Sequence, residues 1–186
     1  MSDGAQPVFF LDLADPDCYL AAERVLRALP ELAEWLPVTG AGIGLAPPRP
    51  DWDGIAARVR ALGLLEFRRP PNWPPDPELA ALACTFAKAG GRTVSFAQAL
   101  MRQQFAAGRD IGELDTVLLA AAAAEMHPAA VIKGIELRAT RSALARATDQ
   151  AGAAGVSALP AIVWRGETFA GPEALELAAV AMAQAA

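Results

Sequence analysis

The sequence predicts an α/β fold in which two stretches, one near each end of the chain, form a single sheet. The first stretch is a run of bulky apolar residues followed by a helix-start signal. The second, residues 155–171, is an apolar run entered through a proline, then a polar turn and a second apolar run. The segment between them is rich in alanine, the residue with the highest helix propensity, so we expect it to be helical.

The C-terminal stretch has the pattern of a strand, a hairpin and a second strand. Pro160 precedes the apolar run 161–164. Proline cannot donate to a sheet ladder, so it is tolerated at the first strand position, and an X-Pro bond at such an entry is a candidate for the cis form. Residues 165–167 form a polar break with glycine, which predicts a hairpin turn before a strand over 168–170. Pro172 suits the first position of a helix.

The N-terminal stretch predicts a strand over residues 8–13 that leads into a helix. Asp15 fits the N-cap, Pro16 the first helical position, and Asp17 the end of the helix dipole that favours negative charge. Apolar residues then recur at spacings of four, three and four, which places them on one helix face: Cys18, Ala22, Val25 and Leu29.

Together the two stretches have the strand and helix order of a thioredoxin-like fold. In such folds the start of the first helix faces the loop before the special proline, so we expect Leu159–Pro160 to be cis and to face that helix start. A further strand is expected over residues 34–38, at a sheet edge because of Pro37. All four strands, 8–13, 34–38, 161–164 and 168–170, should share one sheet.

The middle of the chain predicts a block of helices inserted into this core. Residues 40–50 and 66–75 are rich in glycine or proline and should be irregular. Between and after them we expect helices over 55–62, 78–89, from a cap at Ser95 to 105, 111–124, 128–135 and 144–154. We therefore divide the chain into a thioredoxin-like core, residues 1–51 and 141–186, and a helical insertion, residues 52–140, that forms one wall of the binding cleft.

Composition excludes several classes of function. The 186 residues are 54% hydrophobic and 20% charged, which indicates a packed globular protein rather than a disordered one. The net charge of −5 gives no basic footprint for nucleic acid or for an anionic membrane surface. No apolar run is long enough to span a bilayer and no secretory signal is recognisable. The two cysteines, Cys18 and Cys84, form no C-x-x-C pair, which fits a reducing cytoplasm.

Four motifs carry a resemblance to a known family. Residues 10–21, FLDLADPDCYLA, resemble the S-P-Y-S-Y-L-A opening of 2-hydroxychromene-2-carboxylate isomerases and kappa-class glutathione transferases. These belong to the wider DsbA-like group, which carries C-P-x-C-Y at this place. Residues 155–171 resemble the family's G-V-x-G-V-P-T-F-V-x-x-G-x-x-F-x-G, residues 105–111 its F-x-x-G-x-D-I, and residues 148–155 its T-x-x-A-x-x-x-G. The resemblance spans nearly the whole chain and implies a DsbA-like thioredoxin fold with a large all-helical insertion.

The resemblance makes Asp15 the candidate catalytic residue. Redox members carry a cysteine at this position, and the isomerases and transferases carry a serine that bonds the thiol of bound glutathione. An aspartate has no sulfur, so dithiol–disulfide exchange through this position is excluded. As an anion it would disfavour the glutathione thiolate, or it could accept the thiol proton as a general base. The alternative is that Asp15 only caps its helix.

The resemblance also implies a glutathione site at Leu159, Pro160 and Glu173. Leu159 would offer its main-chain N–H and C=O to the cysteinyl backbone of glutathione, a contact that needs no particular side chain. Glu173 matches the aspartate of the family's G-x-D-R, which helps to hold the γ-glutamyl end. The arginine of that motif is absent, because the place is Ala174. The alternative for Glu173 is stabilisation of the helix dipole.

The other chemically distinctive residues favour structural roles. Cys18 and Cys84 are expected to be buried, as free cysteines usually are. His127, the single histidine, precedes a proline at a helix start and suits a cap or the surface, with a substrate contact as the alternative. We expect no metal site, because no carboxylate or thiolate stands at a metal-ligand spacing from this histidine. The tryptophans are expected to pack in the core or the cleft rather than stack on a ligand: Trp52, Trp73 and Trp164.

Two functions of different class remain open on the sequence. The first is a cytoplasmic, glutathione-dependent isomerase or transferase that acts on a small aromatic metabolite, with glutathione as cofactor and a homodimer as one arrangement. The second is a catalytically degenerate DsbA-like domain that binds a small molecule or a protein partner. Neither would catalyse dithiol exchange.

Overall fold

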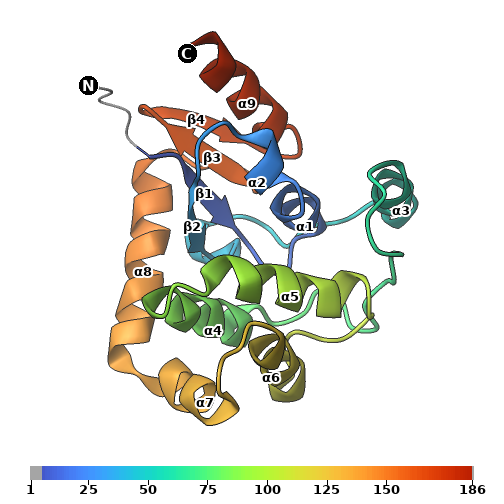
Figure 1. Cartoon of the computed structure of the whole chain (residues 1–186), viewed down its shortest axis with the longest axis vertical. Coiled ribbons are helices and arrows are strands. Elements are labelled where there is room, and N and C mark those ends of the chain that lie inside the picture. Colours follow the sequence, from blue (N-terminus) through green and yellow to red (C-terminus); the bar gives the residue numbers. More distant parts are fainter. Residues whose placement is uncertain (1–5, 186) are drawn as a thin grey trace.

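The computed structural model describes residues 6–185, and four strands in it form one sheet (Figure 1). The strands are β1 (Val8–Leu11), β2 (Glu34–Pro37), β3 (Ala161–Trp164) and β4 (Glu167–Ala170), in the spatial order β2-β1-β3-β4. β2 runs parallel to β1, whereas β3 is antiparallel to both β1 and β4. The prediction that both ends of the chain share one sheet is confirmed, although β1 ends two residues earlier than expected.

The central strand, β1, is apolar because both of its faces are covered. Phe9, Phe10 and Leu11 have no exposed surface. Strands buried on both faces carry continuous hydrophobic runs rather than alternating ones. Phe9 packs edge-on against Trp35 of β2, with ring centroids 5.0 Å apart. Phe10 lies opposite Ala161 of β3, so the register ties the two ends of the chain together.

The first helix is broken, which corrects the single helix predicted through Leu29. α1 (Pro16–Ala22) and α2 (Val25–Ala28) are separate. In an unbroken helix the Arg24 N–H would donate to the Leu20 carbonyl. Here it donates to Ala21 instead (3.0 Å), and the Arg24 side chain takes the Leu20 carbonyl through Nε (2.9 Å). The arginine side chain thus replaces a main-chain bond and lets the chain turn.

The inserted helices lie between β2 and β3 in the sequence. After the short turn η1 (Ala41–Ile43), they are α3 (Trp52–Ala61), α4 (Glu78–Ala89), α5 (Thr93–Phe105), α6 (Leu114–Ala123), α7 (Pro128–Glu136) and α8 (Arg138–Ala153). Figure 1 shows α4 to α7 grouped below the sheet, α8 along one side and α3 apart on the other. α9 (Ala174–Gln184) closes the chain and packs on β3 and β4.

Five helix starts differ from those predicted. α3 begins at Trp52 rather than at residue 55, and α9 begins at Ala174, two residues after the Pro172 that was expected to open it. α5 begins at Thr93, and the Ser95 hydroxyl donates to the Arg92 carbonyl rather than capping the helix. α6 begins at Leu114, because the Asp110 side chain holds the preceding residues in a turn by accepting the Gly112 N–H (2.8 Å). α8 begins at Arg138 rather than at residue 144, directly after an extended Leu137 separates it from α7.

The inserted helices share a core with the sheet. The ring of Tyr19 on α1 stacks on that of Phe105 on α5, with centroids 5.3 Å apart. α4 and α7 approach so closely that a Cβ placed on Gly134 would lie 2.4 Å from the ring of Phe86. The first contact holds the insertion against α1, next to the candidate site, and the second packs the inserted helices on one another. Within residues 6–185, no helix has both the length and the apolar character needed to cross a bilayer.

Candidate functional site

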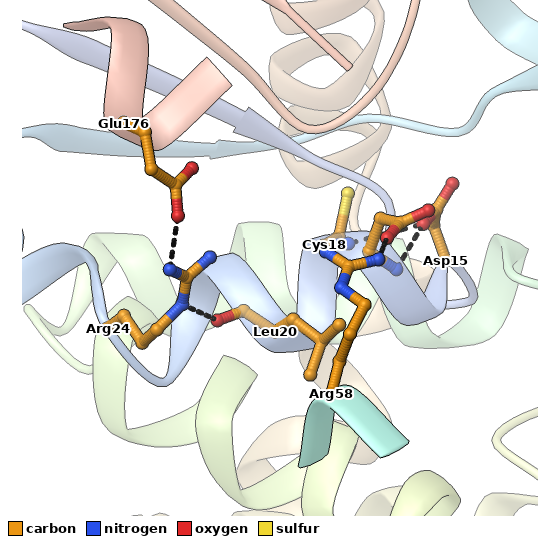
Figure 2. A network of polar contacts seen from close by, with 7 residues as sticks. Asp15, Cys18, Leu20, Arg24, Arg58 and Glu176 are labelled. Atoms are coloured by element: carbon orange, nitrogen blue, oxygen red, sulfur yellow. Dashed lines mark hydrogen bonds and ion pairs between the residues drawn. The ribbon is translucent and has the colours of Figure 1, made fainter. Parts of the chain in front are cut away.

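Asp15 caps α1, as predicted. Its backbone is extended (φ −93°, ψ 123°), and Oδ1 of its side chain accepts the main-chain N–H groups of Asp17 (2.7 Å) and Cys18 (3.2 Å). Pro16 occupies the first helical position, where its missing N–H leaves no bond unmade. Figure 2 shows this cap beside Cys18 at the start of α1. The second carboxylate oxygen, Oδ2, makes no hydrogen bond within the described residues.

The surroundings of Asp15 raise the pKa of its carboxyl from 3.8 to about 7. Burial is the largest cause, and the nearby charges of Asp17 and Asp12 act in the same direction. The two N–H bonds from Cys18 and Asp17 act in the opposite direction, because they favour the anion. Near neutral pH this carboxyl therefore exists in both protonation states, which suits a group that accepts and returns a proton.

Both cysteines are buried, as predicted, and neither is available as a nucleophile. Cys18 has no exposed surface, and its Sγ accepts the main-chain N–H of Asp12 (3.4 Å). Burial, together with the charge of Asp15, raises the pKa of the Cys18 thiol. Cys84 lies inside α4, where burial raises its pKa to about 12. The reactive species of a cysteine is its thiolate, so both thiols are inert at neutral pH.

Asp12 is a buried carboxyl that the sequence reading missed. It follows β1 directly, and its two oxygens accept the N–H groups of Ala14 (Oδ1, 2.8 Å) and Gly40 (Oδ2, 2.6 Å). Burial raises its pKa. The side chain thus joins the turn after β1 to the turn after β2. An acidic residue at the carboxyl end of a fully apolar strand was the signal that could have identified it.

The Leu159–Pro160 bond is cis, as predicted, and both residues are buried. Phe10 pairs with Ala161, so the antiparallel register places Pro160 at the end of the sheet where β1 stops and α1 begins. The Pro160 carbonyl accepts the Gly171 N–H (2.8 Å). The main-chain N–H and C=O of Leu159 make no hydrogen bond within the described part of the chain.

Glu173 lies at the start of α9, where it is exposed and makes no side-chain capping bond. It borders an open cavity of about 600 Å³ together with Pro172, Glu176, Leu177 and Arg58. Arg58, from α3, was not identified from the sequence. It forms an ion pair with Asp17, two residues beyond Asp15 (Figure 2). The inserted helix α3 therefore brings a cation to the gap between the starts of α1 and α9.

A second arginine, at the break between α1 and α2, forms an ion pair with α9. Arg24, which breaks the first helix, also forms an ion pair with Glu176 (Figure 2). The structure thus brings Asp15 and Leu159–Pro160 to one end of the sheet, and Glu173 borders the cavity that Arg58 also lines. Ala174, which stands where the resembling family has arginine, is buried.

The histidine and the tryptophans make structural contacts. His127 caps α7, its Nδ1 accepting the Ala129 N–H (3.2 Å), which confirms the capping interpretation. Trp52 packs edge-on against Trp73, with ring centroids 4.7 Å apart, and Arg165 covers the ring of Trp164. Among residues 6–185, His, Cys, Asp and Glu side chains form no group of three or more that could hold a metal ion.

The chain matches a family model described as a DSBA-like thioredoxin domain over residues 8–183. It also resembles solved structures. A 2-hydroxychromene-2-carboxylate isomerase has a TM-score of 0.84 at 14% identity, covering 97% of this chain and 96% of that one. A probable DsbA oxidoreductase from Streptomyces coelicolor has 0.74 at 20% identity, covering 97% and 89%. The cytosolic disulfide reductase DsbM from Pseudomonas aeruginosa, solved with GSH, has 0.62 at 16% identity, covering 88% of each.

These comparisons confirm the predicted α/β fold, a thioredoxin-like sheet with an all-helical insertion. No curated protein matches the chain in sequence. At these identities the structural likeness concerns the fold.

Proposed function

Because the chain belongs to the DSBA-like thioredoxin domain family, which includes isomerases and oxidoreductases, we propose that it is a glutathione-dependent isomerase or transferase. Its substrate would be a small aromatic metabolite, as the resemblance to 2-hydroxychromene-2-carboxylate isomerase implies. The observation that carries the proposal is the main chain of Leu159. A buried residue whose N–H and C=O both lack a partner within the described chain is prepared to pair with another backbone.

Glutathione fits this backbone because it is a peptide. Its cysteinyl N–H and C=O can pair with Leu159 in the manner of an added strand, and that pairing would direct its thiol toward the end of the sheet where α1 begins. DsbM, a structure similar in fold, was solved with GSH, which supports a glutathione site in this fold. The proposal would place the ligand across Asp15, Leu159, Pro160 and Glu173.

Arg58 supplies a positive charge where the ligand needs one. Glutathione carries two carboxylates and one ammonium group. The resembling family has an arginine at the position of Ala174, so this chain lacks that positive charge. Arg58 borders the cavity next to Glu173 and reaches it from the inserted helix α3. We assign one ligand carboxylate to Arg58 and the ligand ammonium to the side of Glu173, because opposite charges attract across such a gap.

Asp15 would act as the general base for the thiol proton of glutathione. When bound, glutathione would supply a thiol that adds reversibly to the substrate and leaves after a bond has rotated. Asp15 accepts the thiol proton on Oδ2, the oxygen that its helix cap leaves free, and returns it at the end. A carboxyl whose pKa is about 7 can do both near neutral pH. Its cap keeps the carboxyl in place through both steps.

Calorimetry with glutathione tests the proposal directly. We expect binding to the parent protein and weaker binding, by about fivefold or more, to Arg58→Gln. Arg60→Gln is the matched control, since Arg60 is exposed on the same helix and does not border the cavity. A second control is γ-glutamyl-D-cysteinyl-glycine, which keeps every charge and the thiol but inverts the configuration at the cysteinyl Cα, so that the thiol and the backbone amides cannot both take the same positions. Equal affinity for both peptides would contradict pairing with Leu159, and no binding of glutathione would end the proposal.

A catalytically degenerate binding domain is the second candidate. One specific observation favours it: Oδ1 of Asp15 already accepts two main-chain N–H bonds, so the residue has a complete structural role without catalysis. The two candidates differ in what Asp15→Asn should do. Asparagine caps about as well as aspartate. If Asp15 is only a cap, Asp15→Asn should therefore leave both glutathione binding and any turnover unchanged. The catalytic proposal instead predicts that turnover with glutathione is lost while glutathione binding remains.

A further inference from the structure

A ring-sized cavity lies beside the turn that carries Asp15, and the roles given above do not use it. Its volume is about 110 Å³. The turn after β1 contributes Asp12 and Ala14, the segment after β2 contributes Gly40 and Ala46, and the connector before α4 contributes Trp73. Ala41 and five prolines, all from the last two segments, complete the wall. For comparison, an engineered apolar cavity of about 150 Å³ in another protein holds benzene; the lining of this one includes the exposed Ala46.

The aromatic wall of the cavity is held in place before any ligand arrives. The Trp73 indole N–H donates to the Pro48 carbonyl (3.2 Å). The Trp73 ring also packs edge-on against Trp52 and lies 6.5 Å from the ring of Phe105. A fixed indole among proline rings offers flat apolar surface to another flat ring, and a wall that is already ordered costs little entropy on binding.

Asp12 is the one ionisable side chain among the described residues that line this cavity, and none of them is cationic. Each of its carboxylate oxygens accepts one main-chain N–H, from Ala14 or from Gly40, so each keeps a lone-pair site for a further donor. A ligand hydroxyl can therefore donate to Asp12. A ligand carboxylate would be buried without a positive partner and next to an acidic group, which is unfavourable.

We propose that this cavity binds the uncharged, hydroxyl-bearing aromatic ring of a substrate, with Asp12 accepting the ring hydroxyl. Its assignment to the substrate rests on the function proposed above, since Ala14 and Asp15 are neighbours in the same turn. The substrate class is thereby narrowed to phenolic rings whose charged groups, where present, lie outside the cavity. Asp12 would then be a specificity-determining residue, distinct from the proton-transferring Asp15.

The test uses three probes of ring size, added without glutathione to the ¹⁵N-labelled full chain at pH 8: phenol, toluene and benzoate. Phenol should shift the amide signals of Ala14 and Gly40 and the indole signal of Trp73. It should bind at least as tightly as toluene, which has nearly the same shape but no donor, and about tenfold more tightly than benzoate. A cavity that is merely hydrophobic predicts the reverse order for phenol and toluene, which would overturn the role of Asp12.

Two tryptophan variants locate the binding. Ala46→Trp adds a large side chain to the cavity lining at an exposed position and should reduce phenol binding at least tenfold. Ala130→Trp, at an exposed alanine on α7, is the control and should leave it unchanged. Unchanged affinity in Ala46→Trp, or shifts clustered elsewhere in the chain, would refute the assignment. This experiment contains no glutathione, so its outcome is independent of the glutathione proposal. Phenol binding here would stand even if glutathione did not bind. Failure of phenol to bind would leave the glutathione proposal unaffected.

Discussion

Replacing Asp15 with asparagine should make the protein's stability less dependent on pH. The folded state raises the pKa of this carboxyl to about 7, from 3.8. Between those values the folded protein holds a proton that the unfolded chain has released, so stability must fall as the pH rises. The contribution is complete below about pH 4 and is lost as the pH passes about 7. Asparagine has no such proton and keeps the cap.

The size of the effect follows from the two pKa values. The distance from 3.8 to about 7, at about 1.4 kcal/mol per pKa unit, corresponds to at most roughly 4 kcal/mol of unfolding free energy. Most of it should appear between pH 4.5 and 7.5. Asp12, whose pKa is also raised, remains in both proteins, so the difference between them reports Asp15 together with its interaction with Asp12.

Urea unfolding of the parent and of Asp15→Asn, measured at intervals from pH 4.5 to 8, gives that difference directly. We expect the parent to lose stability relative to the variant as the pH rises. A carboxyl NMR titration of Asp15 should show a midpoint near 7 in the same range. A difference that stays flat, or one in which the parent gains stability with rising pH, would refute the reasoning. Either result would mean that the two N–H bonds outweigh burial and hold Asp15 as an ordinary capping anion.

Three further predictions concern the site and the core. Asp15→Ser should bind glutathione at least as well as the parent and lower the pKa of the bound thiol, because it removes a negative charge beside the sulfur; thiolate absorbance against pH measures this, and a lower thiol pKa in the parent would count against it. Insulin reduction should be absent and unaffected by Cys18→Ala, because the thiol is buried and its pKa raised; activity that Cys18→Ala abolishes would overturn this. Gly134→Ala should destabilise by about 1–3 kcal/mol, because its Cβ would meet the Phe86 ring at 2.4 Å. The control Gly152→Ala, whose Cβ meets nothing within 4 Å, should be neutral or stabilising by up to about 1 kcal/mol in urea unfolding; equal losses would contradict the packing argument.

The sequence predicted those features that depend on local chemistry. The apolar run of β1, the proline before β3 and the cap at Asp15 are all decided by neighbouring residues, and the structure confirms each. The break between α1 and α2 was missed because it depends on which donor reaches the Leu20 carbonyl. Helix periodicity shows apolar faces but not a side chain that competes with the main chain for a carbonyl.

The candidate site was predicted only in part for a different reason. Asp15 and Leu159–Pro160 stand in recognisable motifs at the two ends of the chain. Arg58 stands in none of these motifs, and Asp12, although it lies within residues 10–21, was not identified as a site residue, since their partners, Asp17 and Gly40, are 41 and 28 residues away in the sequence. Contacts over such distances come from the tertiary fold. The cavity beside Asp12 likewise needs three separate segments to meet, and no single stretch of the sequence indicates it.

The burial of both cysteines gives the native protein no thiol that a reagent in solution can reach. Cys18 and Cys84 are the two cysteines of the chain, and neither has exposed surface. A thiol-specific dye should therefore react with the protein only when the molecule opens, so the rate of labelling measures how often the cysteines become exposed by unfolding. In a mixture with glutathione, the same dye would count the ligand's sulfur alone. Slower labelling of that sulfur in the presence of protein would then report occupancy of the site without any modification of the chain.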